Sequence, residues 1–150
     1  MKIKCLMFII PVILTACSSF SIDRPGSFAA YLISNGVYRA ISADGVRFRV
    51  RRIPNDAAGT AFLWSETAAL HLKNAGYHEL KNEPFGTTSA LEGRSTEYLY
   101  RYNGENWIYR VVIFTDTACI YIAEAGGMEK YYRKHEKEID SSLKTFRVKK

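Results

Sequence analysis

The sequence has few of the features that identify a membrane-spanning protein or an enzyme. After the first 17 residues, no stretch approaches 18 consecutive apolar residues, so we expect the rest of the chain to lie outside the bilayer. Cysteine is scarce, and Cys5, Cys17 and Cys119 are the only three. The chain has no GxSxG, SxxK or HExxH sequence, no phosphate-binding loop and no cluster of paired carboxylates. Its histidines show no metal-ligand spacing. We therefore predict no catalytic residue, no metal and no cofactor.

The amino terminus has the pattern of a targeting segment. Lys2 and Lys4 precede a short apolar stretch from Cys5 to Leu14, which is too short to span a bilayer and is typical of a signal peptide. The sequence Leu14-Thr15-Ala16-Cys17 resembles the lipobox of bacterial lipoproteins. This resemblance implies removal of residues 1–16 as a signal peptide and acylation of Cys17. An ordinary secretory signal with a chance cysteine is the alternative.

A lipid on Cys17 would have consequences for location and composition. Several acyl chains would hold the protein firmly to a bilayer, since each buried methylene contributes about 0.8 kcal/mol. In the lipoproteins that this segment resembles, absence of aspartate after the cysteine favours the outer membrane, so the resemblance implies attachment there, facing the periplasm. Removal of residues 1–16 would leave 134 of the 150 residues and, with Lys2 and Lys4 gone, would lower the net charge from +6 to +4. Cys119 would remain, and its apolar neighbours predict a buried structural thiol outside any disulfide.

The mature chain is expected to consist of a short tether and one domain. Residues 17–27 are polar and rich in serine, with one proline and one glycine, which predicts a lipidated tether. Residues 28–150 are expected to form a single globular domain. A brief apolar piece from Phe28 to Ile33 suits either a first strand or a turn of helix.

A first hairpin is predicted around Asp44-Gly45, a pair that is typical of two-residue turns. This turn would place Ile41 opposite Phe48 and Arg39 opposite Val50. We expect these residues on the buried face and the remaining arginines of the second strand on the solvent face.

A second hairpin is predicted with a stronger signal, Asn103-Gly104. The turn sets a register in which Tyr100 lies opposite Trp107 and Glu97 lies opposite Arg110. Aromatic pairs and opposite charges across strands stabilise such a hairpin by roughly 0.2 to 1 kcal/mol per pair.

Helical periodicity appears twice, on either side of the predicted strands. One helix is expected from Gly59 to Ala75 and the other from Met128 to Phe146. Pro84 predicts a loop, and Gly126-Gly127 are expected to end the last strand. The order of the elements predicts an α+β fold, in which helices pack on a largely antiparallel sheet.

The end of the second helix carries a family resemblance. Ile139, Ser142, Leu143, Thr145 and Phe146 match the closing helix of PsbP-like α/β/α sandwich domains, which include small lipoproteins of the DcrB type. The resemblance spans residues 36 to 148. It implies a PsbP-like sandwich that binds partners or assists assembly and has no catalytic site.

Two sets of side chains are candidates for binding surfaces. The first is a basic row suited to an anionic partner, namely Arg47, Arg49, Arg51 and Arg52. The second is an aromatic set, namely Tyr98, Tyr100, Tyr102, Trp107 and Tyr109. The alternative for the basic row is a solvated face or protection of a sheet edge. The alternative for the aromatic set is burial under a helix, which we favour.

These patterns favour a lipid-anchored protein of the bacterial cell envelope that binds or scaffolds another envelope component. Partners of suitable chemistry are an envelope protein, lipopolysaccharide or an acidic glycan, and nucleic acid is not expected. One alternative is an envelope hydrolase or transferase that uses Cys119 or a histidine (His71, His78 or His135). Another is a small-ligand carrier with a pocket between sheet and helices.

Overall fold

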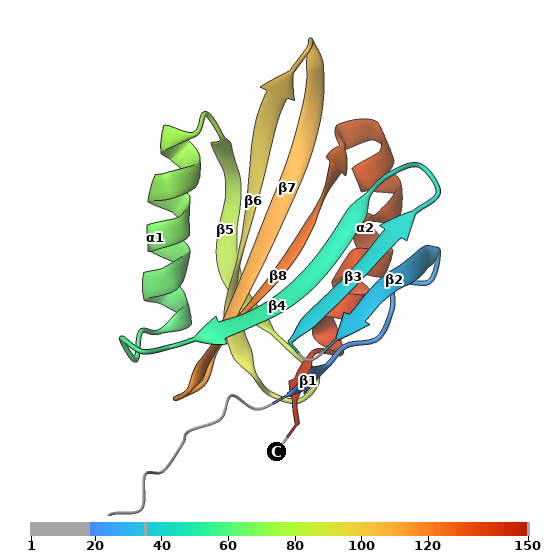
Figure 1. The fold of residues 1–150 in the computed structure, drawn as a ribbon. Helices are drawn as coiled ribbons and strands as arrows, with labels where there is room; N and C mark the ends of the chain where they lie inside the picture. The colour runs from blue at the N-terminus through green and yellow to red at the C-terminus, as the bar shows by residue number, and fades with distance from the viewer. Residues whose placement is uncertain (1–18, 35, 150) are drawn as a thin grey trace, which may run out of the picture.

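The computed structural model describes residues 19–34 and 36–149. Seven antiparallel strands form one sheet in the order β2-β3-β4-β8-β7-β6-β5 (Figure 1). These strands are β2 (Phe28–Ser34), β3 (Val37–Ser42), β4 (Arg47–Pro54), β5 (His78–Gly86), β6 (Glu92–Tyr102), β7 (Glu105–Thr115) and β8 (Cys119–Met128). A separate short pair is formed by β1 (Phe20–Ser21) and β9 (Arg147–Val148). The helices are α1 (Ala61–Asn74) and α2 (Glu129–Lys144). The predicted α+β fold with a largely antiparallel sheet is confirmed.

The two helices cover opposite faces of the sheet and unequal parts of it. α2 closes the larger hydrophobic core, where Tyr132, Ile139 and Leu143 pack with Phe48 and Val50 of β4. α1 packs chiefly on β5, β6 and β7, at one side of the other face. The part of that face formed by β3, β4 and the upper half of β8 has no helix over it (Figure 1). Within the described residues, neither helix is long and apolar enough to cross a membrane.

Local sequence signals located the helix ends and the second hairpin correctly. α1 begins after Thr60, whose side chain accepts a hydrogen bond from a helix amide, and Gly76 follows its end with a positive φ of 90°. Asn103 and Gly104 form the β6–β7 turn with φ of 50° and 78°. Every predicted pair of that hairpin is present, including Tyr100 opposite Trp107.

The first hairpin differs from its predicted register by one residue. The Ser42 amide donates to the Val46 carbonyl at 2.9 Å, so three residues, rather than two, lie in the loop. Gly45, the last of the three, takes a positive φ of 87°, as is common in three-residue hairpin loops. Because side chains alternate along a strand, a shift of one residue moves each side chain of β3 to the other face of the sheet from the one predicted. Arg39 therefore lies opposite Arg49, instead of opposite Val50.

Two predicted interruptions of the sheet are wrong. Pro84 lies within β5, opposite Arg94, and is tolerated because β5 is an edge strand with one unpaired side. Gly126 and Gly127 lie within β8, where Gly126 pairs with both β4 and β7 and Gly127 pairs with β7. A Cβ atom on Gly127 would lie 3.0 Å from Cγ2 of Val46, so this glycine permits close packing instead of ending the strand.

The described part of the predicted tether lies against the domain. β1 pairs with β9, and the Asp23 amide donates to Oγ1 of Thr145 at 2.9 Å. The Ser27 amide donates to the Glu138 carboxylate at 2.8 Å. Residues 19–27 are therefore docked on the domain, because α2 and β9 supply partners for their backbone groups. Cys17 and the predicted signal peptide lie outside the described residues.

Cys119 is fully buried at the start of β8, as expected. It is nevertheless disulfide-bonded, so the prediction of a thiol outside any disulfide is wrong for this structure. The prediction follows from the lipobox resemblance, which assigns Cys17 to a lipid and so leaves no second cysteine for a disulfide.

Candidate binding groove

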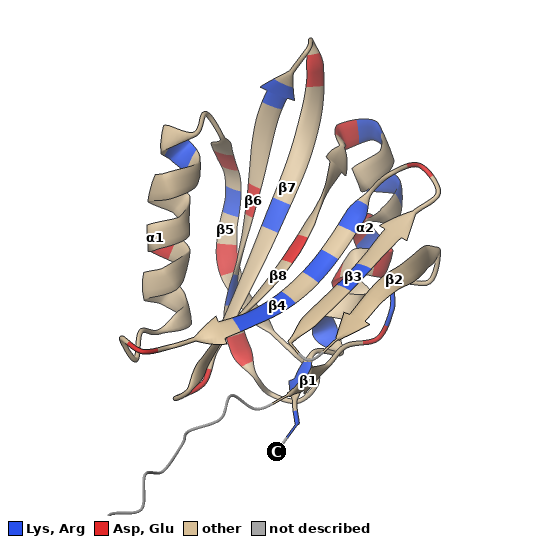
Figure 2. Cartoon of the chain, in the orientation of Figure 1, with Lys and Arg blue, Asp and Glu red and all other residues tan. Residues whose placement is uncertain are grey.

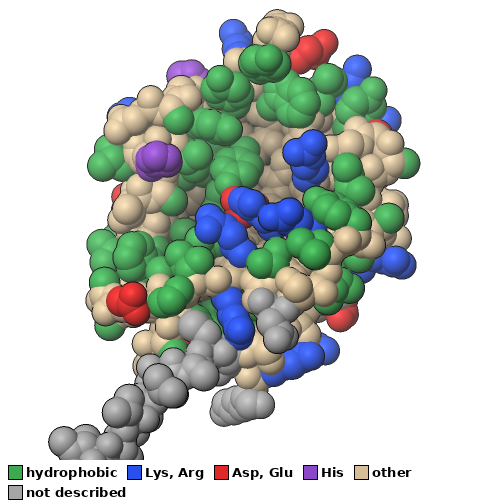
Figure 3. All heavy atoms as spheres, in the orientation of Figure 1, with side chains coloured by type: hydrophobic (Ala, Val, Ile, Leu, Met, Phe, Trp, Pro, Cys, Tyr) green, Lys and Arg blue, Asp and Glu red, His purple; other side chains and the backbone are tan. Residues whose placement is uncertain are grey.

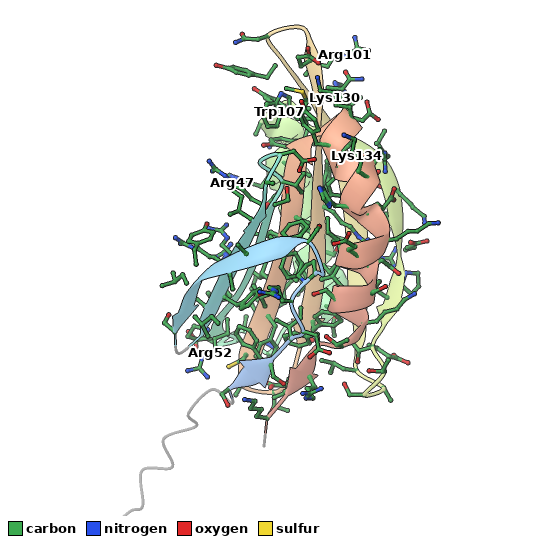
Figure 4. The ribbon with its side chains drawn as sticks, turned by 90° about the vertical axis from the view of Figure 1, so that its right-hand side faces the viewer. Arg47, Arg52, Arg101, Trp107, Lys130 and Lys134 are labelled. Carbon is green, nitrogen blue, oxygen red and sulfur yellow. The ribbon has the colours of Figure 1, made fainter. Side chains whose placement is uncertain are left out.

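The arginine row and the aromatic set, predicted as separate surfaces, meet on one face of the sheet. Gly126 of β8 pairs with Arg47 of β4 on one side and with Tyr109 of β7 on the other. Directly paired residues project from the same face of a sheet, so Arg47 and Tyr109 flank a position that has no side chain. In Figure 4, Lys134 lies on α2 at one side of the sheet, and Arg47 projects from the opposite side.

These side chains line a groove of about 850 Å³ on the face that α1 leaves open. In Figure 3, basic side chains lie in the hollow with an acidic group among them, and hydrophobic side chains surround them. Figure 2 shows the same arrangement on the ribbon, with basic positions along β4 and an acidic position on the neighbouring β8. The charged and aromatic residues of the lining are Tyr31, Arg39, Arg47, Phe48, Arg49, Tyr77, Tyr100, Tyr102, Trp107, Tyr109 and Glu124.

A buried carboxylate, Glu124, organises the floor of the groove. Nε of Arg49 donates to Oε2 at 2.6 Å and its Nη2 donates to Oε1 at 2.7 Å, which is a two-pronged ion pair. The Tyr109 hydroxyl donates to Oε1 at 2.6 Å, and Nε of Arg51 lies 3.4 Å from Oε2. Only 7% of Glu124 is exposed, so these partners replace the water that burial removes.

This network fixes the charge states of its members. Burial alone would raise the pKa of Glu124, but hydrogen bonds from Arg49 and Tyr109, and the charges of Arg49 and Arg51, hold the pKa below its usual range. Burial, followed by the charge of Glu124, raises the pKa of Tyr109. At neutral pH Glu124 is therefore an anion and Tyr109 is a neutral donor.

Two arginines of the groove have no such partner. Among the described residues, neither Arg39 nor Arg47 forms a hydrogen bond or an ion pair through its side chain. The charged lining consists of Arg39, Arg47, Arg49 and Glu124, which leaves a net charge of +2 in the groove. Like charges on one face repel each other, so an anion in the groove would relieve the repulsion.

The structure places the predicted basic row on two faces. Arg47 and Arg49 line the groove, and Arg51 lies on the same face beside Glu124. Arg52 follows Arg51 directly and is aligned with Tyr121, a residue of the core under α2. Arg52 is therefore removed from the anionic-partner surface, because side chains alternate between the faces of a strand.

The aromatic set is also divided, because α1 covers only part of it. Tyr98 is 2% exposed and packs under α1, as the burial alternative predicted. Tyr100 and Tyr109 are partly buried in the groove. Tyr102 and Trp107, beyond the end of the helix, are 57% and 36% exposed at the rim. The burial alternative therefore holds for Tyr98, and the exposed-surface alternative holds for Tyr102 and Trp107.

Four members of the groove were not predicted as binding residues from the sequence: Tyr31, Arg39, Tyr77 and Glu124. Arg39 would have been found with the correct hairpin register. Glu124 could not be placed on a face of the sheet, because Gly126-Gly127 predict the end of the strand beside it. Tyr31 and Tyr77 had no signal, since their positions depend on how distant strands pair.

A second cleft, of about 720 Å³, lies between α2 and strands β5 and β6. Most of its charged side chains are already paired. Arg133 contacts Glu97 at 2.8 Å, and Lys81 contacts Glu83 at 2.7 Å. This cleft therefore offers less uncompensated charge than the groove on the opposite face.

The histidines do not form a reaction centre with Cys119. His71 and His78 are exposed. His135 lies between Asp44, 2.9 Å from Nε2, and the Ser27 hydroxyl, 3.0 Å from Nδ1. This serine also donates to Glu138 at 2.7 Å, so the contacts fasten the amino-terminal segment to α2. Within the described ranges, no group of three or more potential metal ligands is present.

Comparisons with known proteins identify the fold. No family model and no curated protein match the sequence. LpqN, involved in cell envelope biogenesis of Mycobacterium tuberculosis, superposes with a TM-score of 0.68 at 11% identity, over 91% of this chain and 88% of LpqN. PsbP from the cyanobacterium Synechocystis superposes with a TM-score of 0.54 at 13% identity, over 91% of this chain and 96% of that protein.

The chain has a PsbP-like fold. A Pseudomonas aeruginosa protein of unknown function is also similar, with a TM-score of 0.58 at 14% identity, over 83% of this chain and 99% of that one. At these identities the likeness concerns the fold alone. The PsbP-like sandwich implied by the closing helix is thereby confirmed as a fold.

Proposed function

We propose that this protein is a lipid-anchored, non-enzymatic binding module of the bacterial cell envelope whose groove holds an anionic partner. The observation that carries the proposal is the pair Arg39 and Arg47, which line a groove with aromatic walls and have no ion-pair partner among the described residues. The lipobox resemblance at Cys17 and the similar fold of LpqN support the envelope location.

The chemistry of the groove favours an anion for two reasons. A guanidinium group offers planar donors that match carboxylate and phosphate groups. Glu124 cannot satisfy Arg39 and Arg47 as well, because Arg49, Arg51 and Tyr109 already surround it. Positive charge is therefore left uncompensated where a partner can reach it.

The proposed anchor would orient the domain on the membrane. Cys17 lies three positions before Phe20, and a fully extended chain spans about 10 Å over three positions. The end of the domain with β1 and β9 would thus face the bilayer. Outer-membrane attachment facing the periplasm is part of the proposal.

The lining of the groove supports the non-enzymatic part of the proposal. It contains no serine, threonine, cysteine, histidine or lysine that could act as a nucleophile or a proton carrier. Its single carboxylate, Glu124, is held as an anion by its partners. A hydrolase or transferase would therefore need residues that this groove does not supply, and an open groove suits docking better than enclosure of a carried ligand.

Retention on anionic beads tests the groove. Full-length protein in detergent is applied to beads that carry polyphosphate, polyglutamate or heparin, and to uncharged beads, over a range of salt concentrations. We expect retention on at least one anionic matrix and its loss in Arg47→Glu. Arg101→Glu makes the same change of charge at an exposed position on the opposite face of β6. This variant should still be retained on the anionic beads. Equal loss in both variants would show a general charge effect and refute the groove.

Fatty-acid labelling tests the anchor. Cells that make the protein should incorporate labelled palmitate into it, and Cys17→Ala should abolish the label. The sulfur of a cysteine cannot carry a lipid and a disulfide at once. Recovery of a peptide in which Cys119 is disulfide-linked to Cys17 would therefore refute the anchor.

A further inference from the structure

We infer that the ligand of the groove is an acidic saccharide, whose sugar rings pack on the aromatic rim and whose anionic group binds Arg39 and Arg47. This inference rests on the proposed function and names the chemical class of the anion. Three observations carry it: exposed aromatic rings, unpaired tyrosine hydroxyls and the position of the two arginines.

The first observation is the set of aromatic rings at the mouth of the groove. Tyr31, Tyr102 and Trp107 are 57%, 57% and 36% exposed, and all three line the same groove. Behind them, Tyr77 and Tyr100 are stacked, with ring centroids 4.7 Å apart and an angle of 25° between the planes. The stack gives the groove a rigid wall. Flat rings of this kind fit the C–H faces of sugar rings.

The second observation concerns the polar tips of these rings. Within the described residues, the hydroxyl groups of Tyr31, Tyr77, Tyr100 and Tyr102 form no hydrogen bond to protein. By contrast, Tyr109 and Tyr121 use their hydroxyls within the fold. A saccharide carries many hydroxyl groups, each able to donate and accept, so it can satisfy several tyrosine hydroxyls while its ring faces contact the aromatic surfaces.

The third observation is where the free positive charge lies. Arg39 and Arg47 are diagonal neighbours on β3 and β4, since Arg39 is opposite Arg49. Diagonal neighbours on one sheet face have Cβ atoms roughly 7 Å apart, within reach of one carboxylate or phosphate group. The Gly126 position between Arg47 and Tyr109 leaves a gap through which a ligand can reach from the arginines to the aromatic rings.

The lining argues against an acyl chain as the main occupant. A lipid tail requires an enclosed, largely aliphatic channel. Here Ile108 is the one branched aliphatic side chain of the groove lining, and it is 1% exposed. The other apolar area is aromatic, and most of it ends in a hydroxyl group. An acidic peptide would match the arginines, but its aspartate and glutamate side chains have no ring whose C–H face could pack on Trp107.

Calorimetric titration of the full-length protein tests the inference with three ligands. These are a tetrasaccharide of galacturonic acid, the uncharged tetrasaccharide of galactose and the peptide tetraglutamate. We expect the acidic tetrasaccharide to bind most tightly. Trp107→Ala should weaken its binding roughly tenfold, from the lost ring contact, and Trp107→Phe should restore most of it. Arg47→Ala should also weaken it by about tenfold, and Arg101→Ala should leave it unchanged.

The outcomes separate this inference from the proposed function. If tetraglutamate binds as tightly as the acidic tetrasaccharide and Trp107→Ala affects neither, the groove binds anions and the saccharide is refuted. If galactose binds as well as galacturonic acid, the role of the arginines is refuted. If Arg47 substitutions change neither the calorimetric binding of an anionic ligand nor retention on the anionic beads, the proposed function is refuted as well.

Discussion

Replacing Arg49 by methionine removes the main partner of the buried carboxylate in the groove. Glu124 would keep the Tyr109 hydroxyl at 2.6 Å and Nε of Arg51 at 3.4 Å, but would lose both short bonds from the guanidinium group. Methionine has a similar length and no charge, so the substitution keeps much of the packing along β4. The change therefore isolates the ion pair.

The expected loss of stability follows from the burial of the two partners. Removing one partner of a fully buried ion pair costs about 3 to 5 kcal/mol. The side chain of Glu124 is 8% exposed, but that of Arg49 is 40% exposed, so water already screens part of the interaction. We therefore expect Arg49→Met to lower the free energy of unfolding by about 2 kcal/mol, roughly half of the buried value. For a domain of this size, that corresponds to a fall of roughly 6 to 8 °C in Tm.

The dependence on pH provides a second measurement. The pKa of Glu124 is lower in the folded protein than in the unfolded chain, so its contribution to stability is complete above the unfolded pKa, near 4.3. That contribution is lost as the pH falls through the folded value. The difference between wild type and Arg49→Met should thus be largest at pH 7 and should shrink below about pH 4. Urea unfolding followed by circular dichroism at several pH values measures it.

A matched control is available on the same strand. Arg47→Met makes the same substitution on the same face, where the side chain is exposed and has no ion-pair partner among the described residues. It should change the free energy of unfolding by less than about 0.5 kcal/mol. Equal effects of the two substitutions, or a loss in Arg49→Met that stays constant from pH 7 to pH 3.5, would refute the assigned role of Glu124.

Two further predictions concern stability. His135→Ala should lower the free energy of unfolding by about 1 to 2 kcal/mol in thermal unfolding, chiefly because the His135 ring packs against the Phe28 ring, with centroids 5.3 Å apart. The control His71→Ala, at an exposed position, should have little effect. Gly127→Ala should cost about 1 to 3 kcal/mol in urea unfolding, because the added Cβ would lie 3.0 Å from Val46. Gly86→Ala, where nothing lies within 4 Å, is its control, and equal losses would contradict the packing argument.

The two hairpins show which parts of the fold can be predicted from local sequence. Asn103-Gly104 adopts the two-residue turn, and its register follows from that turn alone. Asp44-Gly45 also suits a three-residue loop, in which the Ser42 amide donates a hydrogen bond to the Val46 carbonyl. The choice between them depends on which face the core needs. Phe48 and Val50 must pack under α2, and the register with Ala40 and Tyr38 opposite them supplies that core.

The groove could not be predicted, because its parts lie far apart in the sequence. Arg49 and Glu124, which form its central ion pair, are 75 residues apart. They meet because β4 pairs with β8, a choice that strand patterns leave open. The exposure of Trp107 likewise depends on where α1 ends over the sheet. The residue types suited to an anion were visible in the sequence, and the surface that they share was not.

The sequence by itself determined the helices, the β6–β7 hairpin and the alternation of charged and apolar side chains along β4, since turns and periodicity depend on neighbouring residues. Tertiary structure alone decided which strands adjoin and how far α1 reaches, and thereby which arginines are neutralised and which stay free. The physical reason is that long-range strand pairing is fixed by the fit of the whole core, whereas each turn is fixed by the torsion angles of a few residues.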